Sequence, residues 1–343
     1  MNFSASRKDL SRRRFLRQGV GGAAVVTAFG LPPATGFAAG ARGNPFALDL
    51  DRYRTVDPKL VHYERVGRFR CPQPEARRLA FGPDGRLYVA AGKYVTLLDR
   101  EGVRAGDIAC PAAPRAVAAA DDLVHVAFQS QVAIYDLKGQ RTAQWEPPPG
   151  RPFLTGIAVG KNDVFVADAG NRAVLRYDRS GKLIGRIGEK NKERDIPGLV
   201  VPSPYLDVEI APDGLLRVNN PGRHRVEAYT FGGDLEAFWG KPSAGIEGFC
   251  GCCNPINLAL LPDGRCITFE KGLPRVKIYG ADGAFECAVA GPDAFLDTAK
   301  EKPVLDGDVG AHGLDGVVDA AGRIYVLDLV AGDIQVMQRK ANL

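Results

Sequence analysis

Four short apolar runs between Leu154 and Ile187 constrain the fold more than any other part of the chain. Each run is rich in Val, Ile, Leu or aromatic residues and is too short for a helix. The runs cover residues 156–159, 164–167, 173–177 and 182–187. Segments rich in Gly, Asn and Asp separate them, and these residues tolerate the backbone of tight turns. The stretch therefore predicts an antiparallel sheet of four strands, here called first to fourth.

One such sheet cannot bury both of its faces, so neighbouring copies are expected, and the sequence supplies them. The other predicted strands lie at 78–81, 86–90, 94–98 and 105–109; 116–119, 123–128, 132–135 and 141–145; 206–210, 215–218, 225–230 and 235–239; 256–260, 265–269, 276–279 and 285–290; and 316–319, 323–327 and 333–338. The last unit lacks a fourth strand, whereas an isolated strand at 62–70 precedes the first unit. Pairing of these two ends would close a ring and remove its exposed edges. We therefore predict an all-β, six-bladed β-propeller over residues 62–343.

The turns of these units carry a recurring sequence. Pro-Asp-Gly occurs at 83–85, 212–214 and 262–264, and related loops read ADAGNR at 167–172 and RHRV at 223–226. These motifs resemble the NHL repeat family, and the resemblance covers roughly residues 62 to 338. It implies the propeller fold but no single function, because that family includes scaffolds, binding proteins and a few enzymes.

The net charge of +5 comes from the N-terminus. Residues 1–38 hold six Lys or Arg and one Asp, and the remainder holds 39 basic and 39 acidic residues. A neutral body has no basic surface to attract nucleic acid or anionic lipid. We therefore expect neither a nucleic-acid partner nor membrane association of the mature protein.

The first 38 residues predict a targeting segment, because a basic region precedes a weakly apolar run at 19–31 that is too short to span a bilayer. The sequence SRRRFLR at 11–17 resembles the twin-arginine export motif. The resemblance implies export by the twin-arginine translocase into the periplasm, with cleavage near Ala38. Residues 39–61 are polar, contain Pro and Gly, and are interpreted as a linker.

Antiparallel alternation divides the loops between the two ends of the ring. Turns between first and second, and third and fourth, strands are short. The connections at the other end join fourth to first strands and second to third strands, and they include the long segments 188–205, 240–255 and 291–312. Long loops on a rigid scaffold usually carry function. We therefore expect a protein or small-molecule ligand to bind at that end, at the mouth of the central channel.

One of these loops concentrates thiols. Cys250, Cys252 and Cys253 fall within four residues, and His312 lies in the next such connection. Three alternatives stay open: thiolate ligation of a transition metal or an iron–sulfur cluster, a strained and redox-labile disulfide between Cys252 and Cys253, and ordinary disulfides that pin the loop. The spacing is not that of a zinc finger.

The remaining four of the seven cysteines divide into two pairs. Cys71 and Cys110 each end a fourth strand before a Pro, so they occupy equivalent positions and could form a disulfide or join the thiol-rich site. Cys266 and Cys287 lie on strands separated by a third one and are interpreted as core residues.

Polar residues between second and third strands form another candidate set. They are Asp168, Asn171, Asn219, Asn220, Glu270, Lys271 and Arg275. Carboxylate and amide oxygens could bind a hard cation or polar substrate, as in gluconolactonase-like propellers, although turn formation explains Asp and Asn equally well. His224, His62 and His125 fall on repeat or strand patterns and are interpreted as structural.

The leading functional hypothesis is an exported, non-catalytic binding protein whose thiol-rich mouth holds a metal, a cluster or a redox-active disulfide. The first alternative is a divalent-cation-dependent lyase or hydrolase that uses the same mouth. The second is an interaction scaffold with structural disulfides.

Overall fold

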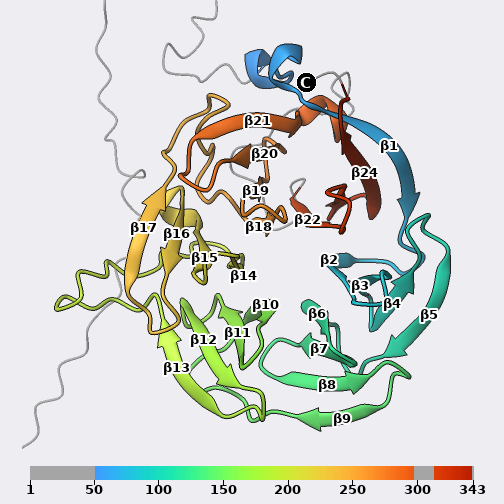
Figure 1. The fold of residues 1–343 in the computed structure, drawn as a ribbon, viewed down its shortest axis with the longest axis vertical. Helices are drawn as coiled ribbons and strands as arrows, with labels where there is room; N and C mark the ends of the chain where they lie inside the picture. The colour runs from blue at the N-terminus through green and yellow to red at the C-terminus, as the bar shows by residue number, and fades with distance from the viewer. Residues whose placement is uncertain (1–50, 297–312, 342–343) are drawn as a thin grey trace, which may run out of the picture. The chain divides into compact units, whose positions relative to one another are not determined.

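The computed structural model describes residues 51–296 and 313–341, which form a ring of six four-stranded antiparallel sheets (Figure 1). The first three blades comprise β2 (Ala76–Phe81), β3 (Leu87–Ala91), β4 (Tyr94–Leu98) and β5 (Arg104–Ala109); β6 (Ala116–Ala120), β7 (Leu123–Ala127), β8 (Val132–Asp136) and β9 (Arg141–Gln144); and β10 (Leu154–Val159), β11 (Asp163–Asp168), β12 (Ala173–Asp178) and β13 (Leu183–Ile187). The predicted six-bladed propeller is confirmed.

The other three blades follow the same order from the axis outward. They comprise β14 (Val208–Ile210), β15 (Leu216–Asn220), β16 (Arg225–Tyr229) and β17 (Leu235–Trp239); β18 (Asn257–Leu260), β19 (Cys266–Phe269), β20 (Val276–Tyr279) and β21 (Phe285–Ala290); and β22 (Leu314–Val318), β23 (Ile324–Asp328), β24 (Asp333–Arg339) and β1 (Tyr63–Arg70). Strand β14 begins two residues later than expected, because the amide of Asp207 bonds the side chain of Asn219 instead of the ladder.

The ring closes through its two ends, as the sequence predicted. Strand β1 pairs antiparallel with β24 in a register from Tyr63 opposite Arg339 to Arg70 opposite Asp333. The backbone N–H of Lys340 also donates to the carbonyl of His62 at 2.9 Å. This pairing gives the sixth blade its fourth, outermost strand, so the outer edge of β24 is not left open to edge-to-edge association.

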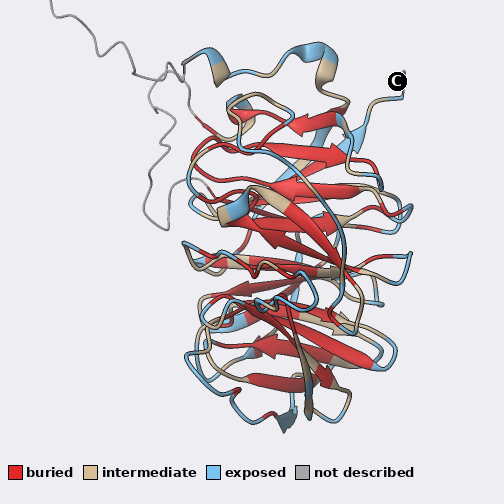
Figure 2. Cartoon of the chain, turned by 90° about the vertical axis from the view of Figure 1, so that its left-hand side faces the viewer, coloured by how far each residue is buried: buried red, intermediate tan, exposed pale blue. Residues whose placement is uncertain are grey.

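The core consists of apolar layers between neighbouring blades, and the strands are buried almost throughout their inner parts (Figure 2). For example, Leu87 and Val89 of the first blade pack with Tyr325 and Leu327 of the sixth. A single sheet with two apolar faces is stable only when both faces are covered, at about 25 cal/mol for each Å² of apolar surface removed from water. Cys266 and Cys287 lie in these layers, as predicted.

The Pro-Asp-Gly motifs form the expected tight turns. Gly85 has φ 73°, Gly214 has φ 80° and Gly264 has φ 87°. This left-handed backbone is strained for residues that carry a Cβ, so glycine is required there. The preceding Asp accepts a bond from the amide two residues later, as Asp84 does from Arg86 at 3.1 Å. The repeated Pro-Asp-Gly motif therefore predicts a turn because its Asp and Gly stabilise the turn backbone, and not only because the motif recurs.

The segment before β1 contains two short 3-10 helices, Asp51–Tyr53 and Pro58–Leu60. Val61 then forms a parallel bridge with Ala288, so the end of the predicted linker lies against the fifth blade. The twin-arginine segment lies outside the described residues. Among those that are described, no helix is long and apolar enough to cross a membrane.

Candidate functional site

A cavity of about 310 Å³ opens at the mouth of the channel, at the end where the sequence placed the site. Its wall comes mainly from the residues that precede first strands, and from one connection between a second and a third strand. The lining residues are Glu75, Ala76, Arg77, Arg78, Arg115, Thr155, Pro204, Tyr205, Asn257, Leu329 and Val330. More open hollows of about 540 and 640 Å³ adjoin it, and share Val330 and Pro204 with its wall.

Two guanidinium groups give the wall of this cavity its charge. Arg77 pairs with the exposed carboxylate of Glu75. Arg115 is partly buried, with its Cζ atom 3.9 Å from the centroid of the Phe153 ring, and its guanidinium bonds no acceptor in the described parts of the chain. Burial and the neighbouring Arg77 lower the pKa of Arg115. The wall therefore carries one positive charge, that of Arg115, for which the described residues supply no carboxylate partner.

Arg78 of β2 closes the channel below this cavity. One guanidinium nitrogen donates to Oδ1 of Asn257 at 2.5 Å and to Oδ1 of Asp315 at 3.0 Å, and the other pairs with Asp207. Asp207, Asn257 and Asp315 belong to the fourth, fifth and sixth blades. Arg78 also lines a second cavity of about 240 Å³ on the opposite side of this layer.

The axis holds more carboxyl groups than arginines. Glu209 of β14 faces the second cavity beside Asp207, Asp315 and Arg78. Burial, together with the charges of Asp207 and Asp315, raises the pKa of Glu209 to about 8, although Arg78 acts in the opposite sense. Burial likewise raises the pKa of Asp315 to about 6. One arginine therefore does not fully compensate this group of acids.

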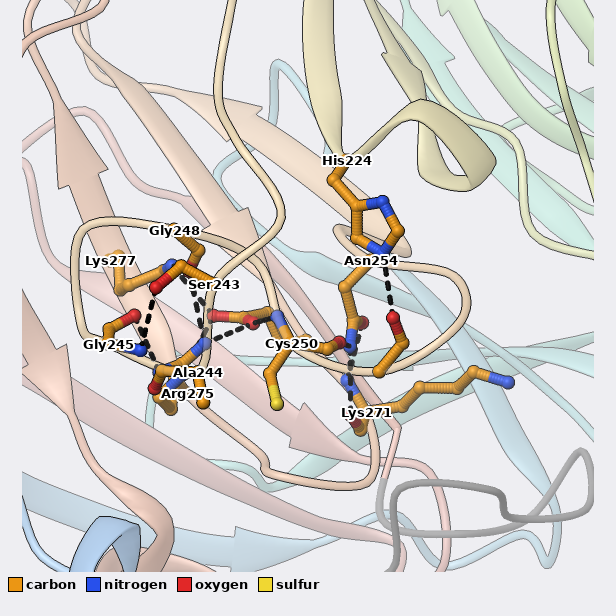
Figure 3. Close-up of polar contacts among 12 residues, drawn as sticks. His224, Ser243, Ala244, Gly245, Gly248, Cys250, Asn254, Lys271, Arg275 and Lys277 are labelled. Atoms are coloured by element: carbon orange, nitrogen blue, oxygen red, sulfur yellow. Dashed lines mark hydrogen bonds and ion pairs between the residues drawn. The ribbon is translucent and has the colours of Figure 1, made fainter. Parts of the chain in front are cut away.

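A buried ionic cluster holds the thiol-rich loop (Figure 3). Glu270 lies between Arg275, at 2.7 Å, and Lys277, at 2.9 Å, and all three side chains are almost fully buried. Both cations also donate to the loop backbone, for instance Lys277 to the carbonyl of Gly248 at 2.6 Å. Burial is the largest influence on Lys277 and lowers its pKa to about 7. The Oε2 atom of Glu270 accepts from the amide of Cys250 at 3.3 Å.

Two further side chains fix the same loop. Asn254 donates to the carbonyls of Cys250 and Lys271 and accepts from the amide of Lys271. His224, which has φ 55°, brings its Nε2 atom to 2.7 Å from the carbonyl oxygen of Gly251. The structural interpretation of His224 agrees with this contact. The loop is thus held on three sides by the fourth and fifth blades (Figure 3).

The three thiols of the loop differ in exposure. Cys250 and Cys253 are buried, whereas Cys252 is exposed. The Sγ atoms of Cys252 and Cys253 lie 3.2 Å apart, and Oγ of Ser203 lies 3.1 Å from Sγ of Cys253. All seven cysteines are free thiols in this structure. No group of three or more His, Cys, Asp or Glu side chains within residues 51–296 and 313–341 is arranged to hold a metal ion.

The other predicted thiol partners are not assembled with this pair. Cys71 and Cys110 are unbonded and pack in different apolar layers, one between the sixth and first blades and one between the first and second. The disulfide considered between them is absent, because each sulfur lies within its own layer. His312 lies outside the described residues.

The polar residues proposed to bind a cation are bonded to groups of their own blade or of the connection that enters the next one. Asp168 accepts from the amides of Phe153 and Asn171, and Asn171 in turn donates to Asp168. Asn219 bonds backbone groups of Asp207, Pro255 and Ile256. The side chains of Asp168, Asn219 and Glu270 have no exposed surface.

Asn220 and Lys271 complete this set. Asn220 accepts from the amide of Val200 and donates to Glu227, and both of its bonds support connections around the fourth blade. Lys271 places its Nζ atom 5.3 Å from the centroid of the Tyr205 ring, at the edge of the mouth. Turn and loop formation, the alternative stated for the Asp and Asn residues, accounts for their contacts.

Sequence reasoning missed the residues that line the mouth. Arg77, Arg78, Arg115 and Tyr205 all precede or begin a first strand, and such strands line the axis. A charged side chain at the start of an otherwise apolar innermost strand was the available signal, most clearly Arg78 before Leu79.

The class of protein is thus a six-bladed β-propeller with a positively charged cavity at one end of its channel. No family model matches the sequence, and no curated protein matches it. Among solved structures, streptogramin B lyase is similar, with 12% identity, a TM-score of 0.54 and coverage of 81% of this chain and 97% of that one.

Other solved propellers are similar to the same degree. A catalytically inactive virginiamycin B lyase from Staphylococcus aureus with quinupristin has 12% identity and a TM-score of 0.54, over 79% of this chain and 82% of that one. The WD40 domain of Neurospora crassa Pan2 has 12% identity and a TM-score of 0.51, over 84% and 98%. Identity this low supports the fold alone.

Proposed function

We propose that this protein binds an anionic ligand, a small carboxylate or phosphate compound or an acidic peptide end, in the mouth of its channel. The observation that carries the proposal is Arg115, a partly buried guanidinium in a cavity wall that has no carboxylate partner within residues 51–296 and 313–341. Desolvating a charge is costly unless an opposite charge accompanies it. A planar guanidinium suits two-point contact with a carboxylate or phosphate.

The surroundings of Arg115 support the same ligand class. Arg77 lies close enough to lower the pKa of Arg115, and the carboxylate that the described wall contains, Glu75, is already paired with Arg77. Lys271 adds a further cation beside Tyr205. An anion entering the cavity therefore meets positive charge from the first and second blades, and Lys271 of the fifth blade lies at the edge of the mouth.

Calorimetric titration with citrate, inorganic phosphate and uncharged glycerol tests this function. We expect saturable binding of at least one anion and none of glycerol. Arg115→Ala should weaken anion binding about 10- to 100-fold, because a hydrogen bond to a charged group contributes ~1.5–3 kcal/mol. Arg141→Ala is the matched control, since Arg141 lies exposed on the outer strand of the same blade. Equal affinities of the Arg115 variant and the parent, or no anion binding, would contradict the proposal.

The enzyme alternative receives less support. Glu270 and Asn219, which it needs as ligands of a divalent cation, are fully buried and bonded to neighbouring protein groups. Among the described residues, the lining of the mouth contains no histidine and a single carboxylate, Glu75. Binding without catalysis is therefore the function that we propose, and membership of the NHL repeat family remains part of this proposal.

Export belongs to the proposal as well. The motif at 11–17 supports transport of the folded chain to the periplasm by the twin-arginine translocase. Cell fractionation should recover the chain outside the cytoplasm, and replacing both Arg12 and Arg13 by Lys should retain it inside. Export of that double variant at the parental level would contradict a twin-arginine route.

A further inference from the structure

We propose that Cys252 and Cys253 form a dithiol–disulfide couple that exchanges with external disulfides. This inference goes beyond anion binding and does not depend on it. It rests on the 3.2 Å separation of the two sulfurs and on their unequal exposure. An accessible thiol beside a buried one is the arrangement needed for attack followed by resolution.

The two thiols have distinct roles in the exchange. The Cys252 thiolate attacks one sulfur of a disulfide RSSR, which forms a Cys252–SR bond and releases RS⁻. The Cys253 sulfur then attacks Sγ of Cys252 and expels the second RS⁻. The protons of the two cysteines pass to the two released thiolates, so two cysteine thiols are oxidised and RSSR is reduced to two RSH.

The environment of Cys253 suits the resolving role. Cys253 is 1% exposed, so an external disulfide does not reach it first, while Cys252 is open to solvent. The Ser203 hydroxyl lies 3.1 Å from Sγ of Cys253 and donates a hydrogen bond to that sulfur. The hydrogen bond between the two thiols raises the pKa of Cys252, whereas the charge of Lys271 acts in the opposite sense.

The loop that carries the pair is fixed on both sides. Cys250 is bonded through its amide to Glu270, Gly251 through its carbonyl to His224, and Asn254 to the backbone of Lys271. Adjacent Cα atoms are about 3.8 Å apart, less than the usual ~4.4–6.8 Å of a disulfide. A bond closed across this pair is strained, so it is readily reduced and reacts further with thiols. Such a bond suits exchange better than permanent cross-linking.

The remaining thiols supply the contrast. Cys71, Cys250, Cys266 and Cys287 are buried, and Cys110 is partly buried in an apolar layer with its sulfur directed to the carbonyl of Ile108. Burial raises the pKa of Cys110 to about 11, which keeps it a poorly reactive thiol. Only the adjacent pair in the described residues combines access with a second sulfur in reach.

Incubation of the air-protected protein with oxidised glutathione tests the couple by mass spectrometry. The parent should lose two hydrogen atoms and two titratable thiols without retaining glutathione, with the bond mapped to Cys252–Cys253. Cys253→Ser should instead retain one glutathione on residue 252, because nothing resolves the mixed disulfide. Cys252→Ser should do neither, and Cys110→Ser should behave as the parent.

Three results would overturn the proposal. The first is a parent that keeps all of its thiols under oxidised glutathione, and the second is a bond mapped to another pair such as Cys250–Cys253. The third is a folded Cys253→Ser protein that captures no glutathione. Circular dichroism of each variant establishes that it is folded. A failure to exchange then reflects the missing thiol and not unfolding.

Discussion

Replacing Arg78 by alanine is expected to lower the free energy of unfolding by ~3–5 kcal/mol, since one partner of a buried ionic group is removed while the others stay. Asp207 and Asp315 would remain buried without the guanidinium that now contacts both. The loss should be larger at pH 8 than at pH 5, because Asp315, whose pKa is raised to about 6, is charged at pH 8 and protonated at pH 5. Urea denaturation at the two pH values measures the difference.

Two further variants sharpen this test. Arg78→Lys keeps the charge but not the two-nitrogen geometry, so an intermediate loss is expected. Arg104→Ala removes an exposed arginine of the same blade whose partner is Asp107, and it should change stability little. Parental stability of the Arg78→Ala protein at pH 8 would show that the axis is not held by this network.

The ring therefore has two kinds of closure. At the rim, β1 completes the sixth blade through backbone hydrogen bonds. At the axis, a single side chain of the first blade joins residues of the fourth, fifth and sixth. The rim pairing fixes the number and order of blades, whereas the axis contact fixes the distance between their inner strands. The anion-binding mouth that we propose lies directly above this contact.

The fold could be predicted because its signals are local. A Pro-Asp-Gly turn requires a positive φ at its third residue, and three such turns have it. Short apolar runs between such turns predict strands, and the unmatched strand at 62–70 predicts the closure. Each of these inferences needs no knowledge of distant contacts.

For the candidate site, the sequence predicted only the end of the ring at which it lies, and not the residues that line it. Arg78 and its partners are separated by 129 to 237 positions in the sequence, so no local pattern associates them. Conversely, Asp168 and Asn219 are conspicuous polar residues at strand ends, yet their oxygen atoms bond backbone groups of neighbouring loops. A polar residue in the sequence does not by itself show whether its side chain binds a ligand or forms hydrogen bonds that stabilise the blade.

The thiol-rich loop could be predicted in part, less fully than the fold but better than the lining of the mouth. Adjacency alone predicts that Cys252 and Cys253 can meet, and the structure places their sulfurs in contact. Cys252 is exposed and Cys253 is buried, and the groups that contact their loop, such as Ser203 and Glu270, lie in other connections. The sequence left a redox-labile disulfide as one alternative among three, and the exchange that we propose for the pair rests on the contact between the two sulfurs and on their unequal exposure.

Replacing Glu209 by glutamine is expected to change the pH dependence of stability. Its pKa in the folded protein is about 8, against an ordinary value of 4.5. Between these values the folded state keeps a proton that the unfolded state has lost, so stability falls as pH rises and levels off above pH 8. Glutamine carries no such penalty. The variant should match the parent near pH 4.5 and exceed it by a few kcal/mol at pH 8.5, since one pKa unit corresponds to ~1.4 kcal/mol.

Urea denaturation across pH 4.5 to 8.5 measures this difference, with Glu236→Gln as the control. Glu236 lies exposed on β17 of the same blade, and its replacement should leave the profile unchanged. In the Glu209→Gln protein the free energy of unfolding should still fall as pH rises through the acid range, because the pKa of Asp315 is raised to about 6. This remaining change should be smaller than the change in the parent. A Glu209→Gln protein whose advantage does not grow with pH would mean that the carboxyl group is ionised at neutral pH. The axis would then hold its excess negative charge without a bound proton.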